Sequence, residues 1–135
     1  MTNFFKKSDL SRSEAENIIS NTLNKCDDGE LYLEDSKSES IVLDDNKIKD
    51  SSYSSDLGFG FRAITDEIVA YSHSNEISKN SLKKSSESLK STLKSSKGIY
   101  NHSIPKSNKK YYENINPIEQ KSLNEKIEIL NKVNN

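Results

Sequence analysis

The spacing of apolar residues changes twice along this chain, and these changes constrain its fold more than any other feature. Between residues 15 and 26, apolar side chains recur at the three- and four-residue spacing of one helix face. From residue 30 to 74 they alternate with polar side chains, as in half-buried strands, and from residue 78 the helical spacing returns. This order of a helix, strands and further helices predicts an α+β fold.

The alternating segment is divided by residues that favour turns. Residues 44–47 and 65–66 carry turn chemistry, because Asp and Asn tolerate the left-handed backbone region that tight hairpins use. All connections are short, and parallel pairing would need crossovers of a dozen or more residues. We therefore predict an antiparallel meander of about five strands, at residues 31–34, 41–43, 48–53, 57–64 and 67–73.

Helix signals stand on both sides of this sheet. Ser11 or Ser13 suits the N-cap of the first helix, with a glutamate three residues further on to complete a capping box. Ser78 suits the N-cap of a helix whose apolar stripe is narrow, with serines where apolar residues would widen it, so we expect this helix to pack lightly. A last helix is predicted from Pro117, since proline is favoured at the first helical position.

These signals divide the chain into four parts. Residues 1–9 carry no periodicity and are predicted to be a disordered N-terminus, followed by an α+β domain at residues 10–97. Residues 98–116 are mostly polar and are predicted to be a linker or crossing segment. Residues 117–135 are predicted to begin a further helix, whose apolar side continues almost to the last residue. A chain that is truncated inside a longer protein would show this pattern, and we expect this chain to be truncated in that way.

Composition limits what such a domain can be. Only 31% of the 135 residues are hydrophobic and 30% are charged, whereas soluble domains have roughly 45–50% apolar residues, so a large self-sufficient core is excluded. The longest apolar run, residues 41–43, is too short to cross a bilayer, and membranes are not among the expected partners. The first residues lack the charged-then-apolar order of a secretory signal, and Cys26 is single and predicted to be buried, so we expect a cytoplasmic protein.

Charge does not select a partner by itself. Twenty basic and 21 acidic residues give a net charge of −1, so no global field attracts nucleic acid. Lysines are concentrated between residues 79 and 110, which leaves a stand-alone peptide- or nucleic-acid-binding module as an alternative hypothesis. The chain has only two arginines and no aromatic residues among the helical lysines, which disfavours nucleic acid.

One candidate functional motif comprises Gly58, Gly60 and Arg62. Their spacing fits G-x-G-x-x-G/A, but that motif binds nucleotides where a strand meets a helix, and here the pattern continues as a strand. The glycines are expected to let another backbone or side chain approach closely. Arg62 shares their face and is expected either to pair with an acid of the sheet or to reach a carboxylate or carbonyl on a substrate path. No spacing of His, Cys, Asp or Glu predicts a catalytic or metal-binding residue.

Six segments, taken in order, resemble the N-terminal region of the TldD/PmbA family. Residues 56–62 are similar to its D-x-G-x-G-x-R segment, and the resemblance spans most of residues 10–133. Tyr32 and the segment from Lys49 to Tyr53 resemble the TldD subunit more than its PmbA (TldE) partner. The matching segments are residues 28–34, 39–45, 48–53, 56–64, 71–78 and 111–130.

The resemblance implies a function that the residues alone do not. It implies the N-terminal fragment of a zinc metalloprotease that cleaves small or unfolded peptides as a TldD–TldE heterodimer. In that family a His-Glu-x-x-x-His helix holds zinc and the glutamate activates water. This motif does not occur here, so we expect the chain alone to be inactive and to hold no cofactor. Its expected role is that of a chamber-wall and subunit-contact domain, with a TldE/PmbA-like subunit and a peptide substrate as partners.

Overall fold

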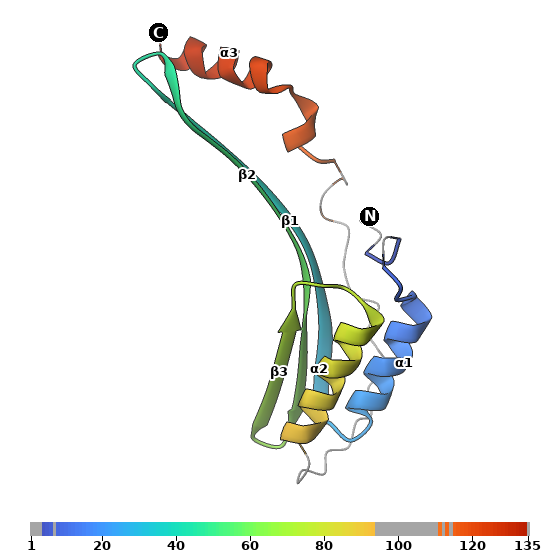
Figure 1. Cartoon of the computed structure of the whole chain (residues 1–135). Helices are drawn as coiled ribbons and strands as arrows, with labels where there is room; N and C mark the ends of the chain where they lie inside the picture. Colours follow the sequence, from blue (N-terminus) through green and yellow to red (C-terminus); the bar gives the residue numbers. More distant parts are fainter. Residues whose placement is uncertain (1–3, 7, 94–110, 112, 114, 135) are drawn as a thin grey trace. The chain divides into compact units, whose positions relative to one another are not determined.

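The chain has an α+β fold built on a three-stranded sheet, as predicted (Figure 1). The computed structural model describes residues 4–6, 8–93, 111, 113 and 115–134, so most of the predicted linker at residues 98–116 lies outside the described residues. The strands follow one another in the order β1-β2-β3. The elements are α1 (Arg12–Leu23), β1 (Asp28–Asp44), β2 (Lys47–Thr65), β3 (Ile68–Ser74), α2 (Lys79–Thr92), the 3₁₀ turn η1 (Ile118–Gln120) and α3 (Leu123–Asn134).

The chain divides into two compact units. The first, which we call the sheet unit, comprises residues 2–35 and 57–109. The second, which we call the tip unit, comprises the described residues within 36–56 and 110–135. The sheet unit contains α1, α2, β3 and the adjoining parts of β1 and β2, and the tip unit contains the turn between β1 and β2 together with α3.

The prediction of about five strands is wrong, because the first two predicted strands are parts of β1 and the next two are parts of β2. The predicted strands end where apolar alternation stops, which leaves gaps at residues 35–40 and 54–56. Alternation reports which side chains are buried, and these polar residues, all exposed except the half-buried Glu39, remain extended without forming a buried face. Neither segment contains a proline or glycine that would end a strand.

The two turns lie where the sequence placed them. Asp45 and Asn46 connect β1 to β2 with φ angles of 48° and 58°. Two positive φ angles are what a tight two-residue hairpin needs, since they match the twist of the flanking strands. Asp66, between β2 and β3, has a φ of 52°. These connections make the sheet antiparallel, with Thr65 opposite Ile68 at the start of the β2–β3 pair.

The core of the sheet unit lies between the sheet and the two helices α1 and α2, which lie side by side over one face (Figure 1). Alternate residues of β2 point into this core, and Phe61 and Ala63 are fully buried. Leu23 of α1 and Leu82 and Leu89 of α2 cover them, each with no more than 2% of its surface exposed. Cys26 is buried in the same core, as predicted.

The expectation that α2 packs lightly is wrong, because its serines form part of a close interface. Ser86 Oγ lies 2.7 Å from Thr22 Oγ1 of α1, and Ser72 Oγ of β3 donates a hydrogen bond of 3.0 Å to Ser85 Oγ. Ser85 and Ser86 are both buried. Small side chains let α2 approach both neighbours, and the hydroxyl pairs satisfy the buried polar atoms.

The structure selects Ser11 from the two N-caps that the sequence allows for α1, and it confirms Ser78 as the N-cap of α2. Ser11 caps α1, and its side chain and that of Glu14 satisfy each other's backbone N–H groups as a capping box. Ser78 caps α2, where its hydroxyl accepts a hydrogen bond of 3.1 Å from the N–H of Ser81.

The last helix begins later than predicted. The segment after Pro117 forms only the three-residue turn η1, and α3 starts after Ser122. Ser122 N donates to Glu125 Oε2 at 2.7 Å, and Glu125 N donates to Ser122 Oγ at 3.3 Å. This second capping box starts a new helix, whereas Lys121 before it is extended.

Within the tip unit, polar contacts attach α3 to the strands. Lys126 of α3 pairs with Glu39 of β1 and donates a hydrogen bond of 2.6 Å to the carbonyl of Ile118. Asn134 Nδ2 lies 2.7 Å from Asn46 Oδ1 in the β1–β2 turn. None of the described residues of α3 is buried. This attachment therefore depends on charge and hydrogen bonding more than on apolar burial.

Candidate interaction surface of the sheet

The face of the sheet that points away from α1 and α2 carries the residues singled out in the sequence. In the register of β2 and β3, Gly60 lies opposite His73, Arg62 opposite Tyr71 and Ile64 opposite Val69. These residues alternate with the buried residues of β2 and β3, so they project to the other face. We call this surface the outer face, made of Glu30, Tyr32, Gly58, Gly60, Arg62, Ile64, Val69, Tyr71 and His73.

Both glycines allow close approach by β3. A Cβ atom at Gly60 would lie 2.6 Å from Tyr71 Oη, so the ring of Tyr71 lies over Gly60. A Cβ atom at Gly58 would lie 2.6 Å from the carbonyl oxygen of Ser74, which is backbone and has little freedom to move. The Tyr71 ring also stacks on His73, with ring centroids 6.0 Å apart and an interplanar angle of 25°.

Arg62 forms an ion pair across the outer face. Its Nη2 atom lies 3.0 Å from Glu30 Oε1 of β1, and the two side chains are 39% and 62% exposed. A pair this exposed contributes about 0–1 kcal/mol to stability. The Nε–H of Arg62 is buried and has no hydrogen-bond partner among the described residues. Of the two roles expected for Arg62, the structure contains the pairing with an acid of the sheet, and the role on a substrate path stays a prediction.

The outer face exposes apolar and aromatic surface. Tyr32 is 60% exposed, Val69 59% and Tyr71 63%. The sequence points to Tyr32 only through its resemblance to the TldD subunit and does not point to Val69 or Tyr71, because each of these two has the features of an ordinary strand residue within its own segment. The available signal was the alternation of Val69, Tyr71 and His73 with the small residues Ala70 and Ser72, which marks two different faces of β3.

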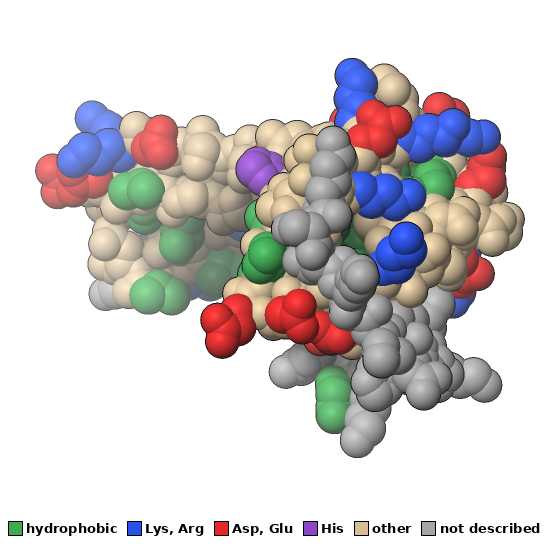
Figure 2. All heavy atoms as spheres, turned by 90° about the horizontal axis from the view of Figure 1, so that it is seen from below, with side chains coloured by type: hydrophobic (Ala, Val, Ile, Leu, Met, Phe, Trp, Pro, Cys, Tyr) green, Lys and Arg blue, Asp and Glu red, His purple; other side chains and the backbone are tan. Residues whose placement is uncertain are grey.

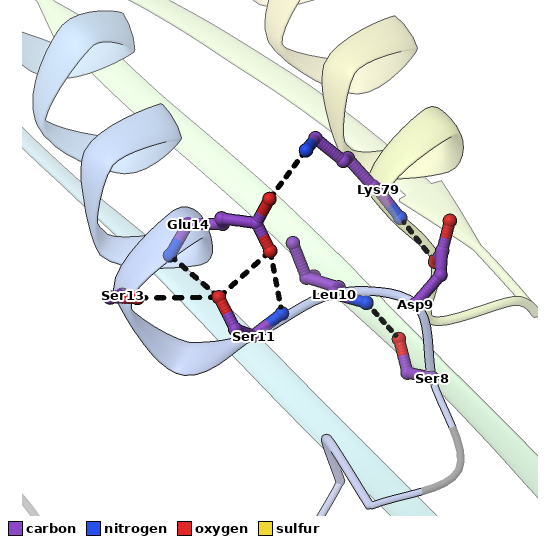
Figure 3. Close-up of polar contacts among 7 residues, drawn as sticks. All are labelled: Ser8, Asp9, Leu10, Ser11, Ser13, Glu14 and Lys79. Atoms are coloured by element: carbon purple, nitrogen blue, oxygen red, sulfur yellow. Dashed lines mark hydrogen bonds and ion pairs between the residues drawn. The ribbon is translucent and has the colours of Figure 1, made fainter.

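A polar network at the start of α1 and α2 fixes the helices that support this face (Figure 3). Lys79 pairs with Glu14 through its side chain, and its backbone N–H donates a hydrogen bond of 3.0 Å to Asp9 Oδ1. The hydrogen bond from Lys79, assisted by those from Ser11, lowers the pKa of Glu14 to about 2. The carboxylate of Glu14 in turn raises the pKa of Lys79.

The described residues do not fit a zinc site. Zinc in proteins needs three or four His, Cys, Asp or Glu ligands that converge on one point. In the part of the chain that the structure describes, no three such residues form a group that could hold a metal. Cys26 is enclosed in the apolar core, where its Sγ lies 3.7 Å from the carbonyl oxygen of Thr22. His102 lies outside the described residues.

The lysine-rich segment is described only in part. Lys83, Lys84 and Lys90 of α2 are exposed, whereas Lys79 is held by the acids of the polar network. On the face drawn in Figure 2, acidic and basic side chains are interspersed. The remaining lysines of the basic segment, from residue 94 to 110, lie outside the described residues. No described helix is both long and apolar enough to span a membrane.

Comparison with known proteins identifies the family. The family model described as PmbA/TldA metallopeptidase domain 1 matches residues 29–99, a stretch that covers β1 to α2 and includes the outer face. The chain belongs to the PmbA/TldD metallopeptidase family, in agreement with the resemblance seen in its sequence.

Curated relatives come from the TldD branch of this family. A Metalloprotease TldD homolog of Buchnera aphidicola subsp. Acyrthosiphon pisum is 35% identical over 109 residues, 80% of this chain and 23% of that protein. The homolog of Haemophilus influenzae is 32% identical over 113 residues, 79% of this chain and 23% of that protein. The chain thus spans less than a quarter of the length of the curated relatives it matches.

Proposed function

We propose that this chain supplies the first domain of a TldD-like zinc metalloprotease and acts as a wall and subunit-contact domain. The observation that carries this proposal is that the match falls on domain 1 of the family, at residues 29–99. The relatives are named as metalloproteases, while the described residues of this chain bring no set of metal ligands together. Peptide hydrolysis is therefore assigned to another part of a longer protein.

We also propose how the enzyme assembles and what it cleaves. The zinc would be bound outside this chain, and the enzyme would cleave small or unfolded peptides in the cytoplasm as a heterodimer with a TldE/PmbA-like subunit. Exposed aromatic and apolar side chains on the outer face support a contact role, since protein interfaces are enriched in Tyr at their centres. Gly58 and Gly60 would act structurally, by admitting β3. Arg62 would reach a substrate carboxylate or carbonyl with the exposed part of its guanidinium.

A chimera tests the assignment of domain and role. The N-terminal region of the Haemophilus relative is replaced by this chain, and hydrolysis of a fluorescently labelled unfolded protein is measured in the presence of its PmbA-like partner. We expect the chimera to retain hydrolysis and the same enzyme without an N-terminal region to lose it. The same chimera with Arg62→Ala tests whether Arg62 contacts substrate. Loss of a substrate contact would raise KM while leaving the thermal unfolding midpoint nearly unchanged.

The isolated chain is the matching control. It is expected to show no hydrolysis of the same substrate and no stoichiometric zinc by elemental analysis. Hydrolysis together with one tightly bound zinc per chain would overturn the proposal, because the metal and the catalytic groups would then lie within these residues.

A further inference from the structure

Strand β3 is an open edge of the sheet. It pairs with β2 on one side, and no strand of the described part of the chain pairs with its other side. Natural proteins usually block such edges with charges, proline or bulges, because unpaired N–H and C=O groups invite another strand. Residues 68–74 contain no Asp, Glu, Lys, Arg or Pro. The other outer strand, β1, carries seven charged residues: Asp28, Glu30, Glu34, Asp35, Lys37, Glu39 and Asp44.

We propose that β3 pairs in antiparallel fashion with β3 of a second copy of this chain, around a two-fold axis at Ala70. The pairing joins two three-stranded sheets into one continuous sheet with the helices of both copies on the same side. Val69 then lies opposite Tyr71 of the second copy, an aromatic and β-branched pair of the kind that stabilises antiparallel sheets. Glu67, next to the start of β3, lies opposite His73 of the second copy.

Charge selects this register over its neighbours. Moving the two-fold axis to Tyr71 would place Asp66 opposite Glu76 of the second copy, which brings like charges together. Moving it to Ser72 would place the carboxylate of Glu76 opposite the apolar side chain of Ile68. Slipping the pairing by a single residue would put the helices of the two copies on opposite faces of the sheet. Among the registers that keep the helices of both copies on one face, only the one at Ala70 sets an acid opposite the imidazole of His73.

The side chains of β3 leave its edge accessible. The Tyr71 ring leans over Gly60 of β2 and stacks on His73, so it lies over the sheet and not over the free edge. Ala70 at the proposed axis is small and only 3% exposed. Ile68 is 38% exposed and would be covered by the second copy. The seven residues of β3 give an interface smaller than the roughly 1,600 Å² of a stable complex, so the dimer is expected to be weak and reversible.

Sedimentation equilibrium of the 135-residue chain tests the pairing, at concentrations from about 10 μM to about 1 mM, where weak interfaces associate. We expect a reversible change from monomer to dimer. His73→Glu should weaken the dimer about tenfold, because it places two carboxylates opposite one another, and Glu67→Lys should also weaken it, because it removes the carboxylate that faces the imidazole. The double variant Glu67→Lys/His73→Glu should restore dimerisation, because it reverses the pair. Glu34→Lys on β1 makes the same charge change at the other edge of the sheet and should leave the dimer unchanged.

Amide hydrogen exchange locates the interface. We expect exchange of β3 amides to slow as the concentration rises, and circular dichroism to show that all variants keep the fold. A chain that stays monomeric throughout would overturn the proposal, as would a dimer that neither single variant weakens or that the double variant fails to restore. Slowing of β3 amides only on addition of an unrelated extended peptide would assign the edge to that partner and also overturn it. Peptide hydrolysis enters none of these measurements, so they are independent of the proposed enzyme role.

Discussion

The sheet unit and the tip unit share the strands β1 and β2 but are stabilised in different ways. In the sheet unit, alternate strand residues such as Phe61 and Ala63 are fully buried under two helices. In the tip unit, none of the described residues is buried, and α3 is attached through ion pairs and amide contacts. A single hairpin can therefore continue from an apolar environment into a polar one without a break in its extended backbone.

Removing a core side chain should produce the largest difference between the units. Leu89→Ala deletes a fully buried side chain in the sheet unit and is expected to lower the free energy of unfolding by about 2–5 kcal/mol. Ile129→Ala removes a side chain of α3 that is 44% exposed and should cost less than about 0.5 kcal/mol. Urea denaturation followed by circular dichroism measures both. Equal losses would show that α3 is as firmly packed as α2.

The two glycines of the outer face should differ in how well they tolerate a methyl group. Gly58→Ala drives its Cβ against the backbone carbonyl of Ser74 and is expected to cost about 1–3 kcal/mol. Gly60→Ala meets the far end of the Tyr71 side chain, which is 63% exposed and can turn away, so the cost should be smaller. The double variant Gly60→Ala/Tyr71→Ala removes the obstacle and tests that explanation. Thermal unfolding of the four proteins measures the effect, and a larger loss at Gly60 would contradict it.

Acid should affect the two capping boxes unequally. The pKa of Glu14 falls from 4.5 to about 2 on folding, so its charged form contributes stability above about pH 4.5, and this contribution is lost as the pH falls towards about 2. The pKa of Glu125 in α3 is lowered mainly by the backbone hydrogen bond from Ser122, and no neighbouring helix donates to it. We expect Glu14→Gln to flatten the decrease in unfolding midpoint between pH 5 and pH 2 more than Glu125→Gln does. Thermal unfolding across this range measures the difference, and equal flattening would contradict it.

The difference between the units also explains which features could be predicted from the sequence. Helix caps and turns are local, so Ser11, Glu14, Ser78 and Asp45 could be identified from single segments. The continuity of β1 could not be predicted. In the tip unit the strand stays extended although its residues are not buried, so burial no longer marks where the strand runs.

Contacts between distant segments could not be predicted from the sequence either. Ser86 meets Thr22 across 64 residues, and nothing near either residue indicates the other. Arg62 was placed on the correct strand face, but the sequence offered many acids and did not select Glu30. The exposed cluster around Tyr71 depends on the register of β2 and β3, which only the folded sheet defines.

Salt should release α3 while leaving the sheet unit folded, and this is the smallest effect expected. The pair between Lys126 and Glu39 is only about a fifth exposed on either side, at 21% and 18%, so ions weaken it less than a surface pair. The pair between Lys37 and Glu119, at 3.3 Å, is more exposed and should be screened first.

Amide exchange at about 0.05 M and about 1 M NaCl, where the Debye length falls to about 3 Å, separates these contributions. We expect faster exchange in α3 at high salt and unchanged exchange in α2 beyond its first turn, because buried leucines and hydroxyl pairs that salt does not screen hold that part of α2. Lys126→Met should give the fast exchange already at low salt, since it removes the charge while keeping most of the aliphatic side chain. Salt-independent exchange in α3 would mean that its exposed apolar residues, and not its ion pairs, hold it to the hairpin.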